Sequence, residues 1–155
     1  MVSFHMAPFR SLSRLIGMLS LLMVAGFTQA EQKIADGKYE IHYNAFNSSF
    51  ITPDVAQQYD LTRSKYRALV NVAVLKLEAD GSKTPVRAQL SGEASNLLQQ
   101  AQQLEFKQVD EGNAIYYLGS FRFTEDEKLT IRLQVRPDAN ADPYNIEFEQ
   151  TFYVD

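Results

Sequence analysis

Seven segments of the chain carry hydrophobic patterns typical of β-strands. In five of them apolar and polar residues alternate with a period of two, which predicts one face against a core and the other in water. Residues 67–78 are instead apolar on both faces, as expected for a strand in the middle of a sheet. The seven predicted strands are residues 39–45, 67–78, 86–91, 104–109, 114–123, 129–136 and 144–154.

Two segments between the strands favour helix. Thr52-Pro53-Asp54 has the residues of a helix start, with Thr52 as the N-cap, Pro53 in the first turn and Asp54 near the positive end of the helix dipole. This helix is predicted to run about two turns, to Tyr59. Residues 95–103, with the sequence SNLLQQAQQ, have a composition that favours a short helical crossover over a strand.

The number and order of these elements predict an all-β domain. No βαβ unit repeats along the chain, and turns separate the strands at short intervals. An immunoglobulin-like antiparallel β-sandwich of about seven strands, with a short helix after the first strand, fits this pattern best. An eight-stranded lipocalin-like barrel is the alternative, and it needs one more strand than the pattern contains. A single domain over residues 31–155 is expected.

The first 30 residues have the pattern of a cleavable secretory signal. Arg10 and Arg14 precede an apolar run of about a dozen residues, and Thr28-Gln29-Ala30 ends in small residues, so cleavage is expected before Glu31. A membrane anchor is the alternative, but the run is shorter than the ~20 residues that cross a bilayer. We therefore expect an exported protein with no membrane span after cleavage.

Removal of the signal makes the expected mature protein more acidic. Of the 15 basic and 19 acidic residues in the chain, the signal takes two arginines, which leaves 13 basic residues and a net charge of −6. An acidic balance without a basic stripe argues against nucleic-acid binding. The oligomeric state stays open.

The segment after the first strand carries a family resemblance. This region contains four short sequences, HYNAFNSSF (42–50), ITPDVA (51–56), LTRSK (61–65) and LVN (69–71). They resemble the DUF4426 family, a domain of unknown function found in exported proteins of Gram-negative bacteria. The resemblance implies residence in the periplasm and a compact β-sandwich. It implies no activity, substrate or cofactor.

Residue content excludes several kinds of chemistry. After signal removal the chain holds one histidine, His42, and no cysteine, so a cysteine nucleophile, a zinc finger or a multi-histidine metal site cannot form within one chain. The GxSxG, P-loop and GxGxxG motifs are also missing. We expect no cofactor and favour a non-catalytic binding module of the cell envelope.

Residues 42–65 are the candidate contact segment of such a module. A connection of this length, holding only a short helix, is longer than a sandwich usually needs, and it could equally be a plug for one end of the fold. An arginine and a lysine within it offer hydrogen bonds and charge to a carboxylate or phosphate. The predicted partner is thus an envelope protein or a small anionic ligand. The candidate binding residues are His42, Tyr43, Asn44, Asn47, Arg63, Ser64 and Lys65.

Two further hypotheses rest on particular side chains. A small hydrolase or lyase could use His42 as general base, with a hydroxyl of Ser48 or Ser49 and a carboxylate of Glu40 or Asp54. No catalytic residue is assigned on this basis, because spacing alone gives no geometry.

A weak calcium site is the second hypothesis. Asp138, Asn140 and Asp142 have the spacing of a calcium loop, with Glu149 at the twelfth position, but Pro143 stands where glycine is usual. An ordinary interstrand loop is the preferred reading. The last predicted strand, residues 144–154, is in addition a candidate sheet edge for pairing with a partner strand.

Overall fold

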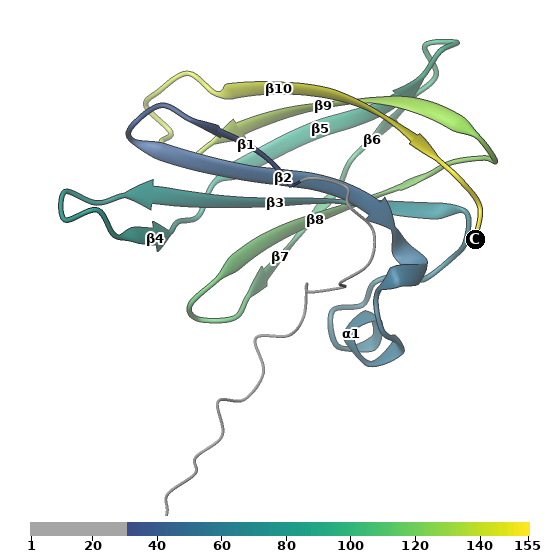
Figure 1. Cartoon of the computed structure of the whole chain (residues 1–155), viewed down its shortest axis with the longest axis horizontal. Coiled ribbons are helices and arrows are strands. Elements are labelled where there is room, and N and C mark those ends of the chain that lie inside the picture. The colour runs from purple at the N-terminus through teal and green to yellow at the C-terminus, as the bar shows by residue number, and fades with distance from the viewer. Residues whose placement is uncertain (1–30) are drawn as a thin grey trace, which may run out of the picture.

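The computed structural model describes residues 31–155, which form two antiparallel β-sheets packed face to face (Figure 1). The larger sheet, sheet A, has the strand order β1-β2-β3-β8-β7, and β4 pairs with the far end of β3. The smaller sheet, sheet B, has the order β10-β9-β5-β6. This architecture confirms the predicted all-β sandwich and differs from the single closed sheet of a barrel.

Ten strands make up the two sheets of the described residues. Sheet A contains β1 (Gln32–Ala35), β2 (Tyr39–Asn47), β3 (Arg67–Leu77), β4 (Lys83–Pro85), β7 (Phe106–Asp110) and β8 (Ile115–Arg122). Sheet B contains β5 (Gln89–Asn96), β6 (Ala101–Gln103), β9 (Glu127–Arg136) and β10 (Tyr144–Phe152). A 3-10 helix, η1 (Ser48–Phe50), and one α-helix, α1 (Pro53–Gln58), connect β2 to β3.

The core lies between the sheets and follows the predicted alternation. On β9 every second residue is buried, while the residues between them face water. The rings of Phe121 on β8 and Phe152 at the end of β10 meet edge to face across the sheets, with centroids 5.2 Å apart. Such aromatic pairs add about 0.5–1.5 kcal/mol to the stabilisation from burial. The buried positions of β9 are Leu129, Ile131, Leu133 and Val135.

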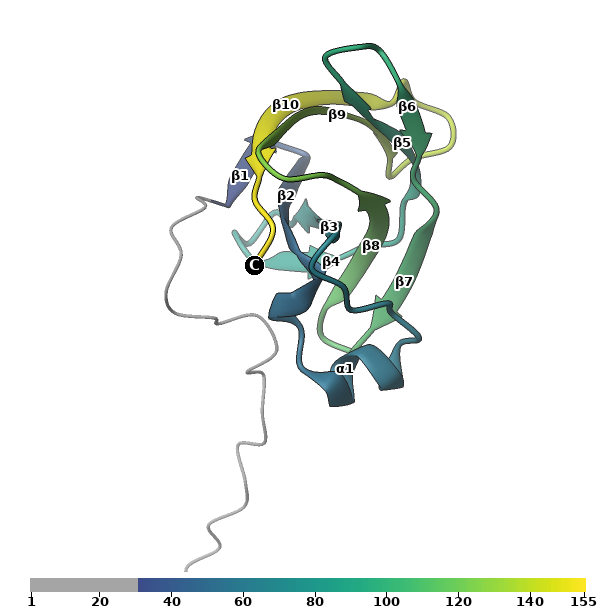
Figure 2. The same ribbon diagram turned by 90° about the vertical axis from the view of Figure 1, so that its right-hand side faces the viewer.

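The short helix after β2 is confirmed. Thr52 caps it by accepting a hydrogen bond from the backbone N–H of Val55, and Pro53 occupies the first turn. The helix lies outside sheet A, close to β7 and β8 (Figure 2). Lys107 of β7 binds the carbonyl and the carboxylate of Asp60, which follows the helix, so the helix is tied to the sheet at its C-terminal end.

The predicted helical crossover at residues 95–103 is wrong. This segment contains the end of β5, a tight turn and β6, which pair as a β-hairpin. The turn places Gln99 in the left-handed region, with φ of +63°, a conformation for which glycine is the usual signal. Glutamine and leucine, which occur often in helices, occupy this turn. The composition therefore favours a helix at the point where the chain reverses direction.

Three short strands lie outside the predicted set, and one prediction lies outside the described residues. Strand β1 occupies the polar leader and pairs with β2, while β4 and β6 extend the edges of the sheets. The expected signal peptide, residues 1–30, falls outside the described residues. Within residues 31–155, no helix has the length and apolar character needed to cross a bilayer.

Candidate functional site

One end of the sandwich gathers the exposed hydrophobic side chains. We call this end the hairpin end: it comprises the β2–β3 connection, the β5–β6 turn, the β8–β9 turn and the residues after β10, and Figure 2 is viewed from this side. Strand pairing brings these segments together, because Asn47 pairs with Ala68, and Asn96 with Leu129. Large hydrophobic side chains exposed among the described residues are Phe50, Tyr66, Leu97, Leu98 and Tyr153. All five belong to the hairpin end.

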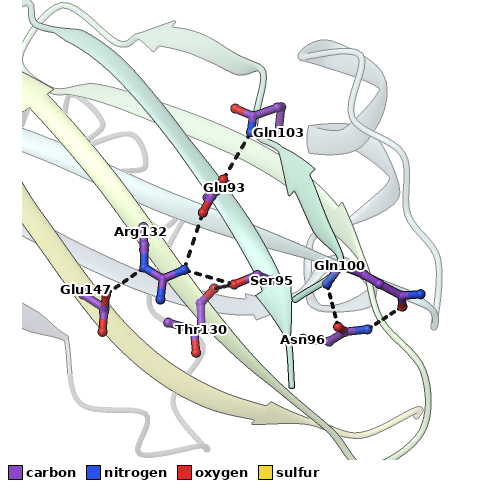
Figure 3. A network of polar contacts seen from close by, with 8 residues as sticks. All are labelled: Glu93, Ser95, Asn96, Gln100, Gln103, Thr130, Arg132 and Glu147. Atoms are coloured by element: carbon purple, nitrogen blue, oxygen red, sulfur yellow. Dashed lines mark hydrogen bonds and ion pairs between the residues drawn. The ribbon is translucent and has the colours of Figure 1, made fainter. Parts of the chain in front are cut away.

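The β5–β6 turn presents two leucines to solvent. Leu97 and Leu98 are 75% and 78% exposed at its tip. The side-chain carbonyl of Asn96 accepts a hydrogen bond from the backbone N–H of Leu98 at 3.0 Å. It also accepts one from the backbone N–H of Gln100 at 3.0 Å, and the Asn96 amide donates to the Gln100 side chain at 2.8 Å (Figure 3). This clamp holds the turn in shape. The two leucines are therefore held in fixed positions with their apolar surface exposed to water, which is unfavourable for an isolated domain.

An open cleft of about 440 Å³ lies beside the turn. Its walls include Tyr66, which is half exposed, Gln100, and Arg122 at the end of β8. The side-chain amide of Gln102 donates to the backbone carbonyl of Arg122 and accepts from its N–H, so the two sheets are joined at the base of the cleft. The cleft is thus lined by an aromatic residue, an amide residue and the end of β8, on a rigid frame.

Basic residues without ion pairs also concentrate at this end. Within residues 31–155, eight of the thirteen basic residues make ion pairs with carboxylates: Lys33, Lys38, Lys76, Lys83, Arg87, Lys107, Lys128 and Arg132. The other five are Arg63, Lys65, Arg67, Arg122 and Arg136. Four of these five lie at the hairpin end, whereas Arg136 lies at the far end of β9.

On the outer face of sheet B, by contrast, two basic residues of β9 form ion pairs with acidic residues. Arg132 of β9 donates to Glu147 at 2.7 Å and to Glu93 at 3.5 Å, and it also reaches Ser95 (Figure 3). The hydrogen bond to Glu147 is the main reason why the pKa of Arg132 is raised. Lys128 and Glu149 form a second ion pair on the same face. Charges on this face satisfy one another, as on an ordinary solvated surface.

The predicted contact segment is braced from within. Arg63 donates to the backbone carbonyls of Ile51 at 2.7 Å and Ser49 at 3.1 Å. The buried hydroxyl of Ser48 donates to the Ser64 carbonyl and accepts from the Ser64 N–H. These bonds fix the connection between β2 and β3. Its polar groups therefore hold the connection itself in shape.

The remaining predicted residues of this segment lie partly at the hairpin end and partly in the middle of β2. Asn47 donates to the Tyr153 carbonyl at 2.8 Å, and the Lys65 ammonium lies 5.2 Å from the centre of the Tyr66 ring. Tyr43 is a core residue against Phe148. Asn44 lies on the outer face of sheet A, opposite Asn71.

His42 belongs to an ion cluster on the outer face of sheet A. Its two ring nitrogens lie 2.5 Å from Glu40 and 3.0 Å from Glu31. Glu40, whose side chain is 7% exposed, also pairs with Lys83 at 3.0 Å and with Lys33 at 3.8 Å. Hydrogen bonds from Lys83 and then His42 lower the pKa of Glu40. The cluster joins β1 and β4 to the centre of the sheet.

The hydroxyls proposed to work with His42 are engaged elsewhere. Ser48 bonds Ser64, and Ser49 donates to the carboxylate of Asp155. Within residues 31–155, no hydrogen bond joins His42 to either serine or to Asp54. The geometry that a general base requires is not assembled around His42 in this structure.

The candidate calcium residues form a turn instead of a converging set. Asp138 accepts a hydrogen bond from the Asn140 N–H at 2.9 Å and pairs with Lys38. Glu149 lies on β10, where it pairs with Lys128 of β9. Across residues 31–155, no three histidine, cysteine, aspartate or glutamate side chains gather in a group that could hold a metal ion.

Sequence reasoning missed three parts of the hairpin end: the leucine-bearing turn, Arg67 and Arg122. The turn lacked its glycine signal, and the two arginines become neighbours only through the register of β3 and β8. No residue from Ala94 to Leu104 is charged, and this uncharged stretch could have marked the turn as a contact segment.

The fold defines a small β-sandwich domain with exposed hydrophobic residues and a cleft at one end. The chain belongs to the DUF4426 family, a domain of unknown function, whose sequence profile matches residues 33–155. The crystal structure of a DUF4426 family protein from Pseudomonas aeruginosa is similar to it, with 33% identity and a TM-score of 0.70, covering 83% of this chain and 99% of that one.

A more distant likeness links the fold to FetP of uropathogenic Escherichia coli strain F11. FetP expressed in the periplasm shares 11% identity and a TM-score of 0.55, over 80% of this chain and 94% of FetP. A copper-bound FetP variant has the same identity and score. At this identity the likeness shows the fold alone. Comparison with curated proteins finds no match.

Proposed function

We propose that this protein is a non-catalytic interaction module of the periplasm that binds a partner protein through its hairpin end. The observation that carries the proposal is the gathering of the exposed large hydrophobic side chains at one end of the described domain. Exposed apolar residues scattered singly are normal on a protein surface, but a group of them beside a cleft is typical of an interaction site.

The composition of this surface favours a protein partner over a membrane. Tyrosine, phenylalanine and arginine are enriched in protein–protein interfaces, and the hairpin end holds all three. Glu125 and Asp126 project from the β8–β9 turn at the same end. Together with the unpaired basic residues of this end they make a surface of mixed charge, and a protein partner can place complementary groups opposite both signs, whereas an anionic lipid surface attracts only the basic ones.

Residence in the periplasm is part of the same proposal. It is supported by the signal pattern of residues 1–30 and by the family profile, which begins at residue 33 and thus leaves that pattern outside the matched domain. The FetP structure comes from protein expressed in the periplasm, and its fold is similar. Fractionation of cells after mild release of the periplasm tests this part directly, since a cytoplasmic location would contradict it.

The contact surface is tested by a paired substitution at the hairpin tip. We expect Leu97→Ser combined with Leu98→Ser to leave the melting temperature unchanged, because both side chains are exposed, and to abolish chemical crosslinking to the partner in living cells. The matched control is Gln134→Ser combined with Asn145→Ser, on the outer face of sheet B. Unchanged crosslinking in the leucine variant would refute the proposed surface.

A further inference from the structure

Two arginines face each other across neighbouring strands at the hairpin end. Arg67, the first residue of β3, pairs in register with Arg122, the last residue of β8. The residues beside them, Ala68 and Phe121, are buried in the core, so both arginines lie on the outer face of sheet A. Side chains in this relation are close neighbours, and like charges there repel each other.

No carboxylate among the described residues lies within ion-pair distance of this pair. Neither arginine makes an ion pair with a carboxylate, although eight other basic residues of the same domain do so. Arg67 donates to the hydroxyl of Ser120 at 3.1 Å, which holds its guanidinium in place without removing its charge. Glu105, which precedes β7, makes no ion pair with either arginine. The domain is acidic overall, so two adjacent unpaired arginines are unexpected unless a ligand uses them.

We infer that Arg67 and Arg122 together bind a carboxylate of the partner protein, supplied by an aspartate or glutamate side chain. This inference rests on the proposed function and names the chemistry of the contact. A guanidinium presents parallel N–H donors that match the two oxygens of a carboxylate, and an anion between the arginines replaces their repulsion with two attractions. The end of β8 that carries Arg122 also borders the cleft beside Tyr66, which places the charged contact and the apolar one at the same end of the domain.

The apolar and charged parts of the hairpin end then have separate tasks. The leucine turn, which carries no charge, buries apolar surface of the partner. The arginine pair fixes the position of the partner by one charged group. A surface with both features selects a segment in which an acidic residue lies near apolar residues.

The inference is tested on the purified protein with glutarate as the probe. Nuclear magnetic resonance follows the side-chain Nε–Hε signals of arginines while glutarate replaces chloride at constant ionic strength. We expect the signals of Arg67 and Arg122 to shift saturably, with a dissociation constant in the millimolar range, and Arg122→Gln to weaken binding at least about fivefold. Arg136→Gln is the matched control, because Arg136 is also unpaired but lies at the other end of the domain.

Three outcomes would overturn the inference. Absence of a saturable shift at Arg67 and Arg122 is the first, and an equal shift at Arg136 is the second. Binding of phosphatidylglycerol vesicles that Arg122→Gln abolishes is the third, because it would assign the pair to a lipid phosphate. If the leucine variant loses its crosslink while Arg122→Gln keeps full crosslinking and glutarate does not bind, the inference fails and the proposed function stands.

Discussion

Arg122 is the residue at which the proposed recognition would conflict with stability. Its side chain faces Arg67 and makes no ion pair within the described domain. We expect Arg122→Gln to raise the free energy of unfolding by a few tenths to about 1 kcal/mol at low salt, because it removes a like-charge pair between strands. Urea unfolding at low and high salt measures this, and the gain should shrink in high salt.

Arg132→Gln is the control for that measurement. Arg132 lies between Glu93 and Glu147, so its removal leaves two acidic residues without their cation and should lower stability. A loss of stability in Arg122→Gln comparable to that in Arg132→Gln would show that Arg122 is an ordinary structural residue. Residues kept for binding are often those whose replacement stabilises the fold.

At the scale of elements, a carboxylate ties the first hairpin to the last strand. Asp36, in the β1–β2 turn, accepts hydrogen bonds from the N–H groups of Lys38 and Tyr39, both at 2.9 Å, and from the hydroxyl of Tyr144 on β10. The Tyr144 hydrogen bond, followed by the two backbone bonds, lowers the pKa of Asp36 to about 2. Burial, followed by the bond to Asp36, raises the pKa of Tyr144 to about 12.

This contact predicts a specific acid sensitivity. The folded pKa of Asp36 is lower than the unfolded value near 3.8, so its contribution to stability is present above about pH 4 and is lost as pH falls through about 2. Tyr144→Phe removes the main cause of the shift and should flatten the fall in stability between pH 4 and pH 2. Urea unfolding of both proteins across this range provides the measurement.

The comparison must be made between the two proteins, because other acidic residues contribute to the same fall. The pKa values of Glu40, Asp60, Asp80 and Glu149 are also lowered. Equal slopes for wild type and Tyr144→Phe would contradict the assigned link between the two sheets. Tyr39→Phe is a suitable control, since Tyr39 supplies its backbone N–H and not a hydroxyl to Asp36.

The β5–β6 hairpin makes a second prediction at this scale. Gln99 adopts a positive φ that costs a residue with a Cβ up to about 1 kcal/mol relative to glycine. We expect Gln99→Gly to stabilise the hairpin by up to that amount while leaving the crosslinking to the partner intact. Hydrogen exchange of the hairpin amides tests this, and faster exchange in the variant would contradict it.

The same elements show what the sequence could and could not predict. Strands β2, β3, β8, β9 and β10 and helix α1 were predictable because their hydrophobic periods and capping residues are local signals. The hairpin was not, because Gln99 takes a turn position without a turn-forming residue type. The arginine pair was not either, because residues 67 and 122 meet only through strand register. Local sequence signals thus indicated residues 42–65 as a candidate contact segment. They gave no sign that Arg67 and Arg122 lie side by side.

At the scale of the whole molecule, the two sheets form a rigid frame with unlike ends. At the end formed by β1, β4 and the Asp36 contact, the basic residues other than Arg136 are paired with carboxylates, as the cluster around Glu40 shows. At the hairpin end, exposed hydrophobic residues and unpaired arginines lie together. A module of this form can be held in the envelope by one partner through one end.

Site-specific photocrosslinking in living cells tests this account most directly. A photoreactive amino acid is placed in turn at Leu97 and Leu98 on the hairpin tip, and at Gln134 and Asn145 on the outer face of sheet B. We expect one envelope protein to be captured from the two tip positions, and Arg122→Gln to reduce the yield several-fold. Capture of the same protein with equal yield from Gln134 or Asn145, or no adduct from the tip, would contradict it.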